Sequence, residues 1–339
     1  MTNLQKSAFV ALGIAFLAAC SSSNNSPATP AGPKPLYVAY TAIGASDAVG
    51  YGASVPCTVA SPALVADPSC PEPGANGYVP DIRTDFAGVG FTAILQDLGI
   101  SGAVIGPDIQ AMGDMYSSAS GPTPCQPRTV GVDAIPGNFL QNELPNLNPG
   151  ATFVTIFAGG NDTNAIVNAI ACGAGGATQA SVTAFITKEV TAFGGDFGTL
   201  VGTVHAKAPN ATIVVANLPN FANIPFALGF PAQLRAALQG TSVAIDQDVI
   251  NTVAAKGIPV VDLLCDPNSY MPQYFYTDGF HPDDAGYALL AQKFVQQALT
   301  DNPVAPESQC AQEAVSSVGK LPNFRRALAT GMKPAFPAR

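Results

Sequence analysis

The chain of 339 residues contains no tryptophan and two histidines, and only 11% of its residues are charged. Its 14 basic residues stand against 23 acidic ones, so the net charge is −9. Because a nucleic-acid-binding surface needs clustered basic residues, and no basic stripe is present, a nucleic-acid partner is excluded. The scarcity of histidine and the lack of C-x-x-C spacing argue against a zinc site. Beyond the first 20 residues, no apolar run is long enough to cross a bilayer.

The first 35 residues have the composition of an export segment. Lys6 supplies a positive charge, a short apolar run follows, and Leu17-Ala18-Ala19-Cys20 resembles a bacterial lipobox. We therefore expect a lipoprotein signal peptide over 1–19, lipidation of Cys20, and a flexible tether over 20–35. An ordinary signal peptide with a chance cysteine is the alternative. The expected location is the bacterial cell envelope, at the outer membrane or cell surface, with Cys20 as the membrane anchor.

The seven cysteines support export. Once Cys20 is set aside, an even number remains, which is typical of disulfides in an exported protein. Parity does not determine which cysteines pair. The pairing that we favour is Cys57–Cys70, Cys125–Cys172 and Cys265–Cys310. The first pair is the best supported, because both cysteines lie in one proline-rich loop.

Five apolar segments have the composition of buried strands, and they alternate with segments of helical apolar spacing. This alternation predicts an α/β fold with three layers, α/β/α, around a parallel sheet of about five strands joined by right-handed crossovers. The predicted strands are 36–44, 91–99, 151–162 (whose last four residues form a polar end), 212–219 and 257–263.

The helices expected between these strands are 78–88, one beginning at Pro107, 138–147, 179–207, 233–255 and one after His281. Gly194-Gly195 is expected to interrupt the helix over 179–207. Residues 36–299 would form one domain, and the tail 300–339 would be tied back through Cys310. We expect a monomer.

The segment Tyr276–Tyr287, YTDGFHPDDAGY, contains His281 with Asp278 three residues before it. Histidine titrates near neutral pH and suits a general base, and a nearby carboxylate can orient its ring. A helix N-terminus, with Asp283 and Asp284 in the first turn, is the simpler interpretation and is compatible with the first. The other histidine, His205, lies near a predicted helix end, where a cation would interact with the terminal carbonyls.

Polar residues follow three of the predicted strands. Ser46 comes after the first strand, Gly102 after the second, and Asn161-Asp162 after the third. In parallel α/β sheets, the carboxyl ends of the strands carry the ligand and the chemistry. Taken singly, each of these residues could simply cap a helix or form a turn.

In this order, the motifs GAS, GAVIG, TIFAGGND and TDGFHPDDAGY resemble those of the SGNH hydrolases, also called GDSL esterases and lipases. The resemblance covers roughly residues 36–298 and implies a flavodoxin-like fold. It implies that Ser46 is the nucleophile, His281 the base and Asp278 its orienting partner. Ser46, Gly102 and Asn161 would form the oxyanion hole, with Gly106 as a competing choice for the glycine.

The sequence departs from the family pattern at three positions. Ala45 and Asp47 replace the usual aspartate and leucine beside the nucleophile, which puts the substrate side of that loop in doubt. Asp97 stands where relatives often have asparagine. The nucleophile itself is retained, so an active enzyme is still expected.

The resemblance thus predicts a serine esterase or lipase that hydrolyses a small-molecule, lipid or glycan ester and needs no metal or organic cofactor. The loops over 53–77 and 103–136 would decide the substrate. One alternative is a non-catalytic, lipid-anchored surface protein that binds glycan or lipid. A second is a metal-dependent hydrolase whose ligands are Asp47, Asp162, Asp278 and His281.

Overall fold

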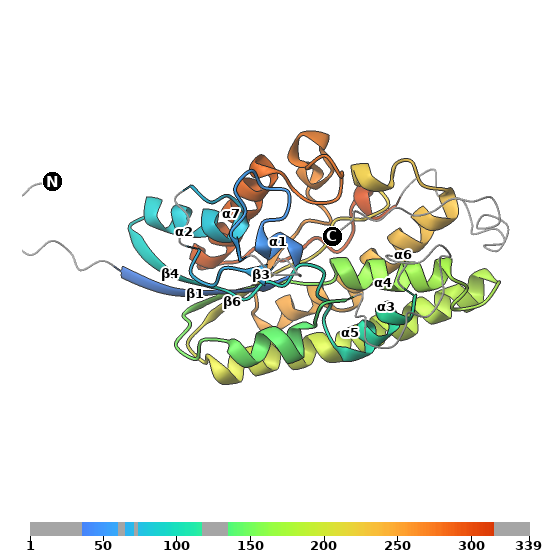
Figure 1. The fold of residues 1–339 in the computed structure, drawn as a ribbon, viewed down its shortest axis with the longest axis horizontal. Coiled ribbons are helices and arrows are strands. Elements are labelled where there is room, and N and C mark those ends of the chain that lie inside the picture. Colours follow the sequence, from blue (N-terminus) through green and yellow to red (C-terminus); the bar gives the residue numbers. More distant parts are fainter. Residues whose placement is uncertain (1–35, 60–64, 71–73, 117–134, 315–339) are drawn as a thin grey trace, which may run out of the picture. The chain divides into compact units, whose positions relative to one another are not determined.

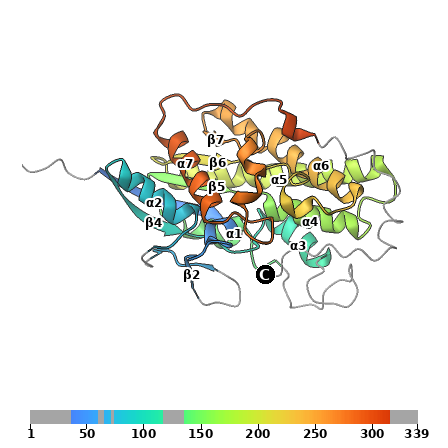
Figure 2. The same ribbon diagram turned by 90° about the horizontal axis from the view of Figure 1, so that it is seen from above.

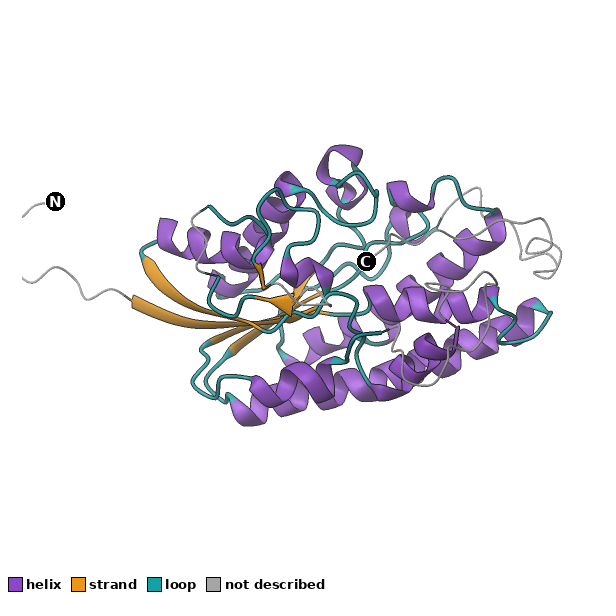
Figure 3. Cartoon of the chain, viewed as in Figure 1, coloured by secondary structure: helices purple, strands orange, loops and turns teal. Residues whose placement is uncertain are grey.

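A computed structural model describes residues 36–59, 65–70, 74–116 and 135–314. Within these residues, five parallel strands form one sheet in the order β4-β1-β5-β6-β7, with helices on both faces (Figures 1 and 3). The predicted three-layer α/β/α fold is therefore confirmed. The predicted signal peptide, Cys20 and the tether lie outside the described residues.

The predicted strands are all present, although four of them are shorter than predicted. Asn217 follows β6 directly, and its side-chain Oδ1 accepts hydrogen bonds from the backbone N–H groups of Leu263 (2.6 Å) and Leu264 (3.1 Å). This side chain takes the place of a strand partner, so sheet pairing stops early on both neighbouring strands. The strands are β1 (Leu36–Gly44), β4 (Phe91–Asp97), β5 (Phe153–Phe157), β6 (Thr212–Ala216) and β7 (Val260–Val261).

Alternate residues of β1 face two different hydrophobic cores, as the period-two geometry of a strand requires. Tyr40 and Ala42 belong to the core under α2 (Tyr78–Gly88) and α7 (Asp284–Leu299). Ile43 belongs to the opposite core. That core is covered by α3 (Pro107–Tyr116), α4 (Gly160–Ala171), α5 (Gln179–Lys207) and α6 (Ala232–Asp248). Figure 1 shows α2 and α7 on one side of the sheet and α3, α4 and α5 on the other, and Figure 2 looks down on the side of α2 and α7.

The predicted break at Gly194-Gly195 is wrong, because α5 runs through both glycines without interruption. Phe193 and Phe197 are buried on either side of them with their rings stacked at 5.8 Å. A side chain at Gly194 would press against Val249 beyond the end of α6. Tertiary packing therefore outweighs the low helix propensity of glycine, and the small residue permits the close approach.

The segment 138–147 is not the regular helix that was predicted. It forms a π-helical turn, Phe139–Glu143, and then a 3-10 turn, Leu144–Asn146, in which Pro145 cannot donate a helical hydrogen bond. The other short elements are α1 (Ser46–Val49), the antiparallel pair β2 (Thr58–Val59) and β3 (Val65–Ala66), and 3-10 turns at Pro225–Ala227, Ile250–Lys256, Pro267–Tyr270, Pro272–Tyr274 and Ala311–Glu313.

Two of the three predicted disulfides, Cys57–Cys70 and Cys265–Cys310, are present, with Cα–Cα distances of 5.4 and 5.6 Å. Cys172 is also disulfide-bonded, but its predicted partner Cys125 lies outside the described residues. The Cys265–Cys310 bridge ties the described part of the C-terminal segment to the domain. In the described part of the chain, every helix is too short or too polar to span a bilayer.

Candidate active site

Ser46 lies at the carboxyl end of β1, at the start of the four-residue helix α1. The chain reverses direction there, because Gly50 adopts a left-handed conformation (φ +76°) and its N–H bonds the carbonyls of Ser46 and Asp47. The backbone N–H of Tyr51 also donates to the carbonyl oxygen of Ser46 at 2.9 Å. This tight turn holds Ser46 in a fixed place, where it is 4% exposed.

His281 lies on the loop that precedes α7. Its ring Nε2 lies 2.9 Å from Ser46 Oγ, and its Nδ1 lies 2.7 Å from Asp278 Oδ2. A carboxylate can only accept, so Nδ1 carries the proton and the lone pair of Nε2 faces the serine hydroxyl. The sequence singled out Ser46, Asp278 and His281. Although Ser46 and His281 are 235 positions apart, the three side chains form one hydrogen-bonded line.

Asp278 is held as a charged carboxylate. Its Oδ1 accepts from the backbone N–H groups of Phe280 (2.8 Å) and His281 (3.0 Å), while Oδ2 faces the imidazole. Burial by itself would raise the pKa of Asp278, but these hydrogen bonds and the imidazole outweigh it and hold the pKa below its ordinary value. The helix-cap interpretation of the same segment also holds, since Asp283 Oδ1 accepts from Gly286 N–H.

Asn161 is in the first turn of α4, after β5. Its side-chain Nδ2 donates to the carbonyl oxygen of Ala103 at 3.0 Å, which uses one of the two amide hydrogens. Gly102 precedes Ala103 and has φ +85°, a conformation that favours glycine. Gly106 packs against α5 instead, where a Cβ would clash with the carboxylate of Asp196. Of the two candidate glycines, Gly102 is therefore the one beside Asn161.

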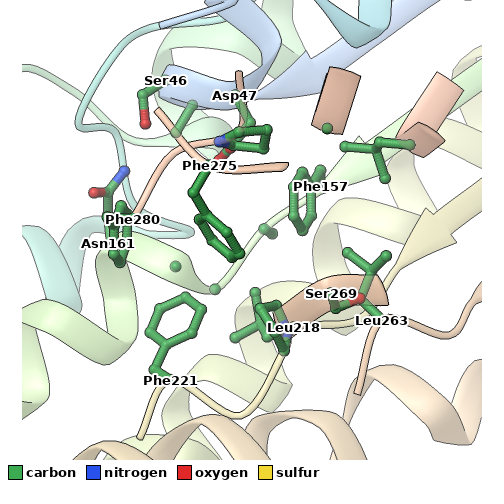
Figure 4. A pocket seen from close by; sticks show the side chains of 18 of the residues that line it. Ser46, Asp47, Phe157, Asn161, Leu218, Phe221, Leu263, Ser269, Phe275 and Phe280 are labelled. Carbon is green, nitrogen blue, oxygen red and sulfur yellow. The ribbon is translucent and has the colours of Figure 1, made fainter. Parts of the chain in front are cut away.

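A pocket opens beside Ser46 and Asn161 (Figure 4). Its open space, which includes solvent at the mouth, is about 880 Å³. Ser46 and Asn161 lie at one side, and Leu263 and Ser269 lie at the opposite one. The walls are mostly apolar, with Phe157, Leu218, Phe221, Leu263, Phe275 and Phe280 among their side chains.

The four groups of the metal-dependent alternative do not converge. Asp162 Oδ1 accepts from Ile105 N–H at 2.9 Å, and burial raises the pKa of Asp162 to about 7. Asp47 is half-buried, and its pKa is raised chiefly by burial. Among the described residues, the one group with three metal-ligand side chains close together is Cys265, Cys310 and Glu313, where the two cysteines are disulfide-bonded.

The sequence did not single out Glu143, a fully buried acid at the end of the π-helical turn. Its Oε2 accepts from Gly44 N–H at 3.0 Å, and it also accepts from the backbone of Ile100. Glu143 thus connects the chain just before Ser46 with the chain just before Gly102. Burial raises its pKa well above the ordinary value. Nothing in the local sequence marks this role, because the contact joins residues 99 apart.

Asp97 is a second buried acid near the same loops. Its Oδ1 accepts from Gly99 N–H at 3.0 Å, and its Oδ2 has no hydrogen-bond partner among the described residues. Burial raises the pKa of Asp97 to about 8. Gly99 in turn packs against Ala48 of α1. At neutral pH the side chain is therefore mainly protonated, which makes it resemble the asparagine that relatives often have at this position.

His205 lies in the exposed last turn of α5, as the sequence predicted. It lies on a different element from Ser46 and His281 and is far from both in sequence.

The arrangement around Ser46, a hydroxyl, an imidazole and a carboxylate in line at the end of a parallel sheet, is that of the serine hydrolases as a class.

The family model of the GDSL-like Lipase/Acylhydrolase family matches residues 42–289, and the chain belongs to this family. The predicted resemblance to SGNH hydrolases is thereby confirmed, and with it the class of carboxylic ester hydrolases. A comparison with curated proteins finds no match.

Several solved structures are similar to the chain. They include the extracellular lipase of Streptomyces rimosus, with 17% identity, a TM-score of 0.46 and coverage of 76% of this chain and 99% of the lipase. Phospholipase A1 of Streptomyces albidoflavus has 20% identity, a TM-score of 0.45 and coverage of 76% and 98%. A family 3 carbohydrate esterase of Clostridium thermocellum has 15% identity, a TM-score of 0.40 and coverage of 77% and 94%.

Proposed function

We propose that the protein hydrolyses carboxylic esters through a covalent acyl-enzyme on Ser46. The observation that carries the proposal is the line of hydrogen bonds from Ser46 Oγ to His281 Nε2 and from His281 Nδ1 to Asp278 Oδ2. Nε2 takes the hydroxyl proton while Oγ attacks the ester carbonyl carbon. The charged Asp278 stabilises the imidazolium that forms.

The tetrahedral intermediate places a negative charge on the former carbonyl oxygen. The donors in this proposal are the backbone N–H groups of Ser46 and Gly102 and the second amide hydrogen of Asn161. The hydrogen bond from Asn161 to Ala103 supports it, because that bond fixes the amide next to Gly102. When the intermediate collapses, the bond from carbon to the alcohol oxygen breaks and Nε2 returns its proton to that oxygen. Water then attacks the acyl-enzyme by the same route and releases the acid.

The apolar pocket is proposed to receive the acyl part of the ester. It begins at Ser46 and Asn161 and is walled largely by phenylalanine and leucine side chains, while His281 is not part of its lining. An apolar chain gains free energy by leaving water for such a surface, about 25 cal/mol for each Å² buried. The preferred ester would therefore carry an apolar acyl group.

Two measurements test the proposal. A fluorophosphonate probe should label the wild type at Ser46 but leave Ser46→Ala unlabelled, and a p-nitrophenyl ester series from acetate to palmitate should give turnover. His205→Ala is the matched control and should be labelled and active. An unlabelled, inactive wild type with a normal unfolding transition would instead favour the non-catalytic binding protein.

We also propose that the protein is exported and anchored to the membrane by lipid on Cys20. The support is the lipobox-like sequence and the disulfides at Cys57–Cys70 and Cys265–Cys310, which form in oxidising compartments. Radiolabelled palmitate should be incorporated by the wild type and not by Cys20→Ser. Label on the Cys20→Ser protein would contradict the anchor.

A further inference from the structure

Two tyrosines lie together beside His281, outside the lining of the apolar pocket. The ring of Tyr51 lies beside the imidazole of His281, with ring centroids 4.5 Å apart. The ring of Tyr276 stands almost perpendicular to that of Tyr51, at 85° and 6.2 Å. Tyr276 is 40% exposed and Tyr51 is half-buried. The two rings form a corner that is open to solvent, and neither residue lines the pocket.

Each of these tyrosines is fixed by its backbone to one residue of the hydrogen-bonded line. The N–H of Tyr51 donates to the carbonyl of Ser46 (2.9 Å), and the N–H of Tyr276 donates to the carbonyl of His281 (2.8 Å). The carbonyl of Tyr51 also accepts from the hydroxyl of Tyr287 at 2.6 Å. The corner is therefore held in place before any substrate arrives, which lowers the entropy cost of binding.

Gly52 makes the corner tight. It has φ +95°, and a Cβ at this position would lie 2.9 Å from Cβ of Tyr276 and 2.7 Å from the carbonyl oxygen of Pro282. The loop that carries Tyr51 can approach the loop that carries Tyr276 only because residue 52 has no side chain. The two loops, 224 positions apart at Gly52 and Tyr276, thus pack as one surface at the histidine.

The chemistry determines which part of the ester meets this corner. His281 Nε2 must reach the alcohol oxygen in order to protonate it as the carbon–oxygen bond breaks. The alcohol part therefore lies on the imidazole side of Ser46, and the acyl part lies on the pocket side, next to Asn161. Burial, followed by the charge of Asp278, raises the pKa of Tyr51, so its side chain is neutral beside the histidine.

We propose that Tyr51 and Tyr276 form the alcohol-binding subsite and favour esters whose alcohol carries a six-membered ring. This inference rests on the proposed ester hydrolysis. A ring substituent placed in this corner can meet one tyrosine ring face to face and the other at its edge, and both offset-stacked and edge-to-face contacts are favourable for rings. The shared chemistry is a flat apolar face, which either a sugar or an aryl ring presents.

The test compares esters of one acid, hexanoic acid, that differ only in the alcohol. Benzyl hexanoate and methyl 6-O-hexanoyl-glucopyranoside carry an aryl and a sugar ring, while ethyl and 3-methylbutyl hexanoate carry none. The quantity measured is the ratio of kcat/KM for each ring ester to that for 3-methylbutyl hexanoate. Because both kcat/KM values in the ratio come from the same variant, a general change in its turnover cancels. The aryl and sugar arms show which kind of ring the corner prefers.

Tyr276→Ala should lower the ratio about three- to tenfold, the usual contribution of an aromatic pair, through a higher KM for the ring esters. Tyr276→Leu keeps apolar bulk without a ring and should lower the ratio as well, which guards against a poorly folded alanine variant. Tyr37→Ala is the control, because Tyr37 is 65% exposed at the start of β1, and its ratio should equal that of the wild type.

A wild type that turns over all four esters with equal kcat/KM would overturn the inference and leave the proposed function intact. The same conclusion follows if both Tyr276 variants keep the wild-type ratio. If the wild type hydrolyses none of the esters, the proposed function fails and takes this inference with it.

Discussion

The carboxyl groups on the two sides of Ser46 have pKa values that are shifted in opposite directions. On the histidine side, Asp278 has a lowered pKa, and its two oxygens receive two backbone N–H groups and the imidazole. Beneath the serine side, Glu143 and Asp97 are more deeply buried and have raised pKa values. Each of these two acids has one oxygen without a partner among the described residues.

The difference shows what keeps a carboxyl group charged at this site. Desolvation opposes ionisation in all three residues and is the largest single influence on each. Asp278 is less deeply buried than the other two, and the imidazole of His281 lies against it in addition to two backbone N–H groups, so its ionised form is favoured. Backbone donors alone are not enough, because Asp162 accepts from Ile105 N–H and still has a raised pKa. The charged Asp278 can assist proton transfer by stabilising the imidazolium, while the neutral Glu143 and Asp97 can only hold the backbone in position.

The largest expected effect comes from removing the side chain of Ser46 or of His281, between which the proton moves. Ser46→Ala or His281→Ala should lower kcat by several orders of magnitude, because residues that act as a unit lose nearly all their effect together. Ester turnover at saturating substrate measures this. His205→Ala should stay near the wild type. If His205→Ala abolished turnover and His281→Ala kept it, with both proteins folded, the assignment of the base would be wrong.

The same chemical change on the two sides tests the comparison directly. Asp278→Asn removes a charge and disturbs the histidine tautomer, so kcat should fall by about 10³–10⁴. Asp97→Asn replaces an acid that is mainly neutral at pH 7 with a neutral isostere, and kcat should change little. Steady-state kinetics at pH 7 gives both values. Equal losses in the two variants would contradict the idea that only Asp278 acts through its charge.

Asn161 is the uncharged side chain of the proposed oxyanion hole. Asn161→Ala should lower kcat by about 10²–10³ with little change in KM, because the amide acts on the oxyanion and not on the bound ester. Single-turnover acylation with a p-nitrophenyl ester separates the two parameters. A rise in KM at constant kcat would assign the side chain to substrate binding instead.

Glu143 tests the neutral side. Glu143→Leu leaves Gly44 N–H without its acceptor and should destabilise the fold by about 1–3 kcal/mol. It should also lower kcat, by less than Asn161→Ala does. Glu143→Gln keeps an acceptor oxygen and should restore most of the stability and the kcat. Urea unfolding and steady-state kinetics on both variants check this. If glutamine were as damaging as leucine, the carboxyl group would have to be acting as an ion.

The smallest effect should appear in stability against pH. Because the folded-state pKa of Asp97 is about 8 against an ordinary 3.8, its contribution is complete below about pH 4 and is lost as pH rises toward 8. Asp162, with a pKa of about 7, acts in the same direction. Tm should therefore fall between pH 5 and pH 8, and the slope should be smaller in Asp97→Asn. An unchanged slope would mean that Asp97 is ionised in the folded protein.

The parts of the site that could be predicted from sequence are those in short motifs beside a strand end or just before a helix. Ser46, Asn161 and the Asp278–His281 pair each belong to a short loop motif whose position follows from the order of strands. The apolar composition of the strands and their alternation with helices similarly predict the parallel sheet. These features depend on local chemistry, which the sequence displays directly.

The features that were missed depend on contacts between distant segments. Glu143 reaches Gly44 across 99 positions, and Tyr51 meets Tyr276 only because two loops pack together at Gly52. The continuous α5 and the shortened β7 have the same origin, since packing on Val249 and the side chain of Asn217 decide them. Local propensity and spacing do not contain this information.

The last covalent link that supports the pocket is made by a residue near the end of the chain. Cys310 joins Cys265, and the carbonyl oxygens of Gln312 and Glu313 accept from the side chain of Asn220 at 2.8 and 3.2 Å. Asn220 lies between Pro219 and Phe221, which both form part of the pocket wall. The segment that begins at Cys310 thus supports, through one disulfide and two hydrogen bonds, a part of the pocket wall next to Asn220, which lies 92 and 93 positions before the two residues that accept from it.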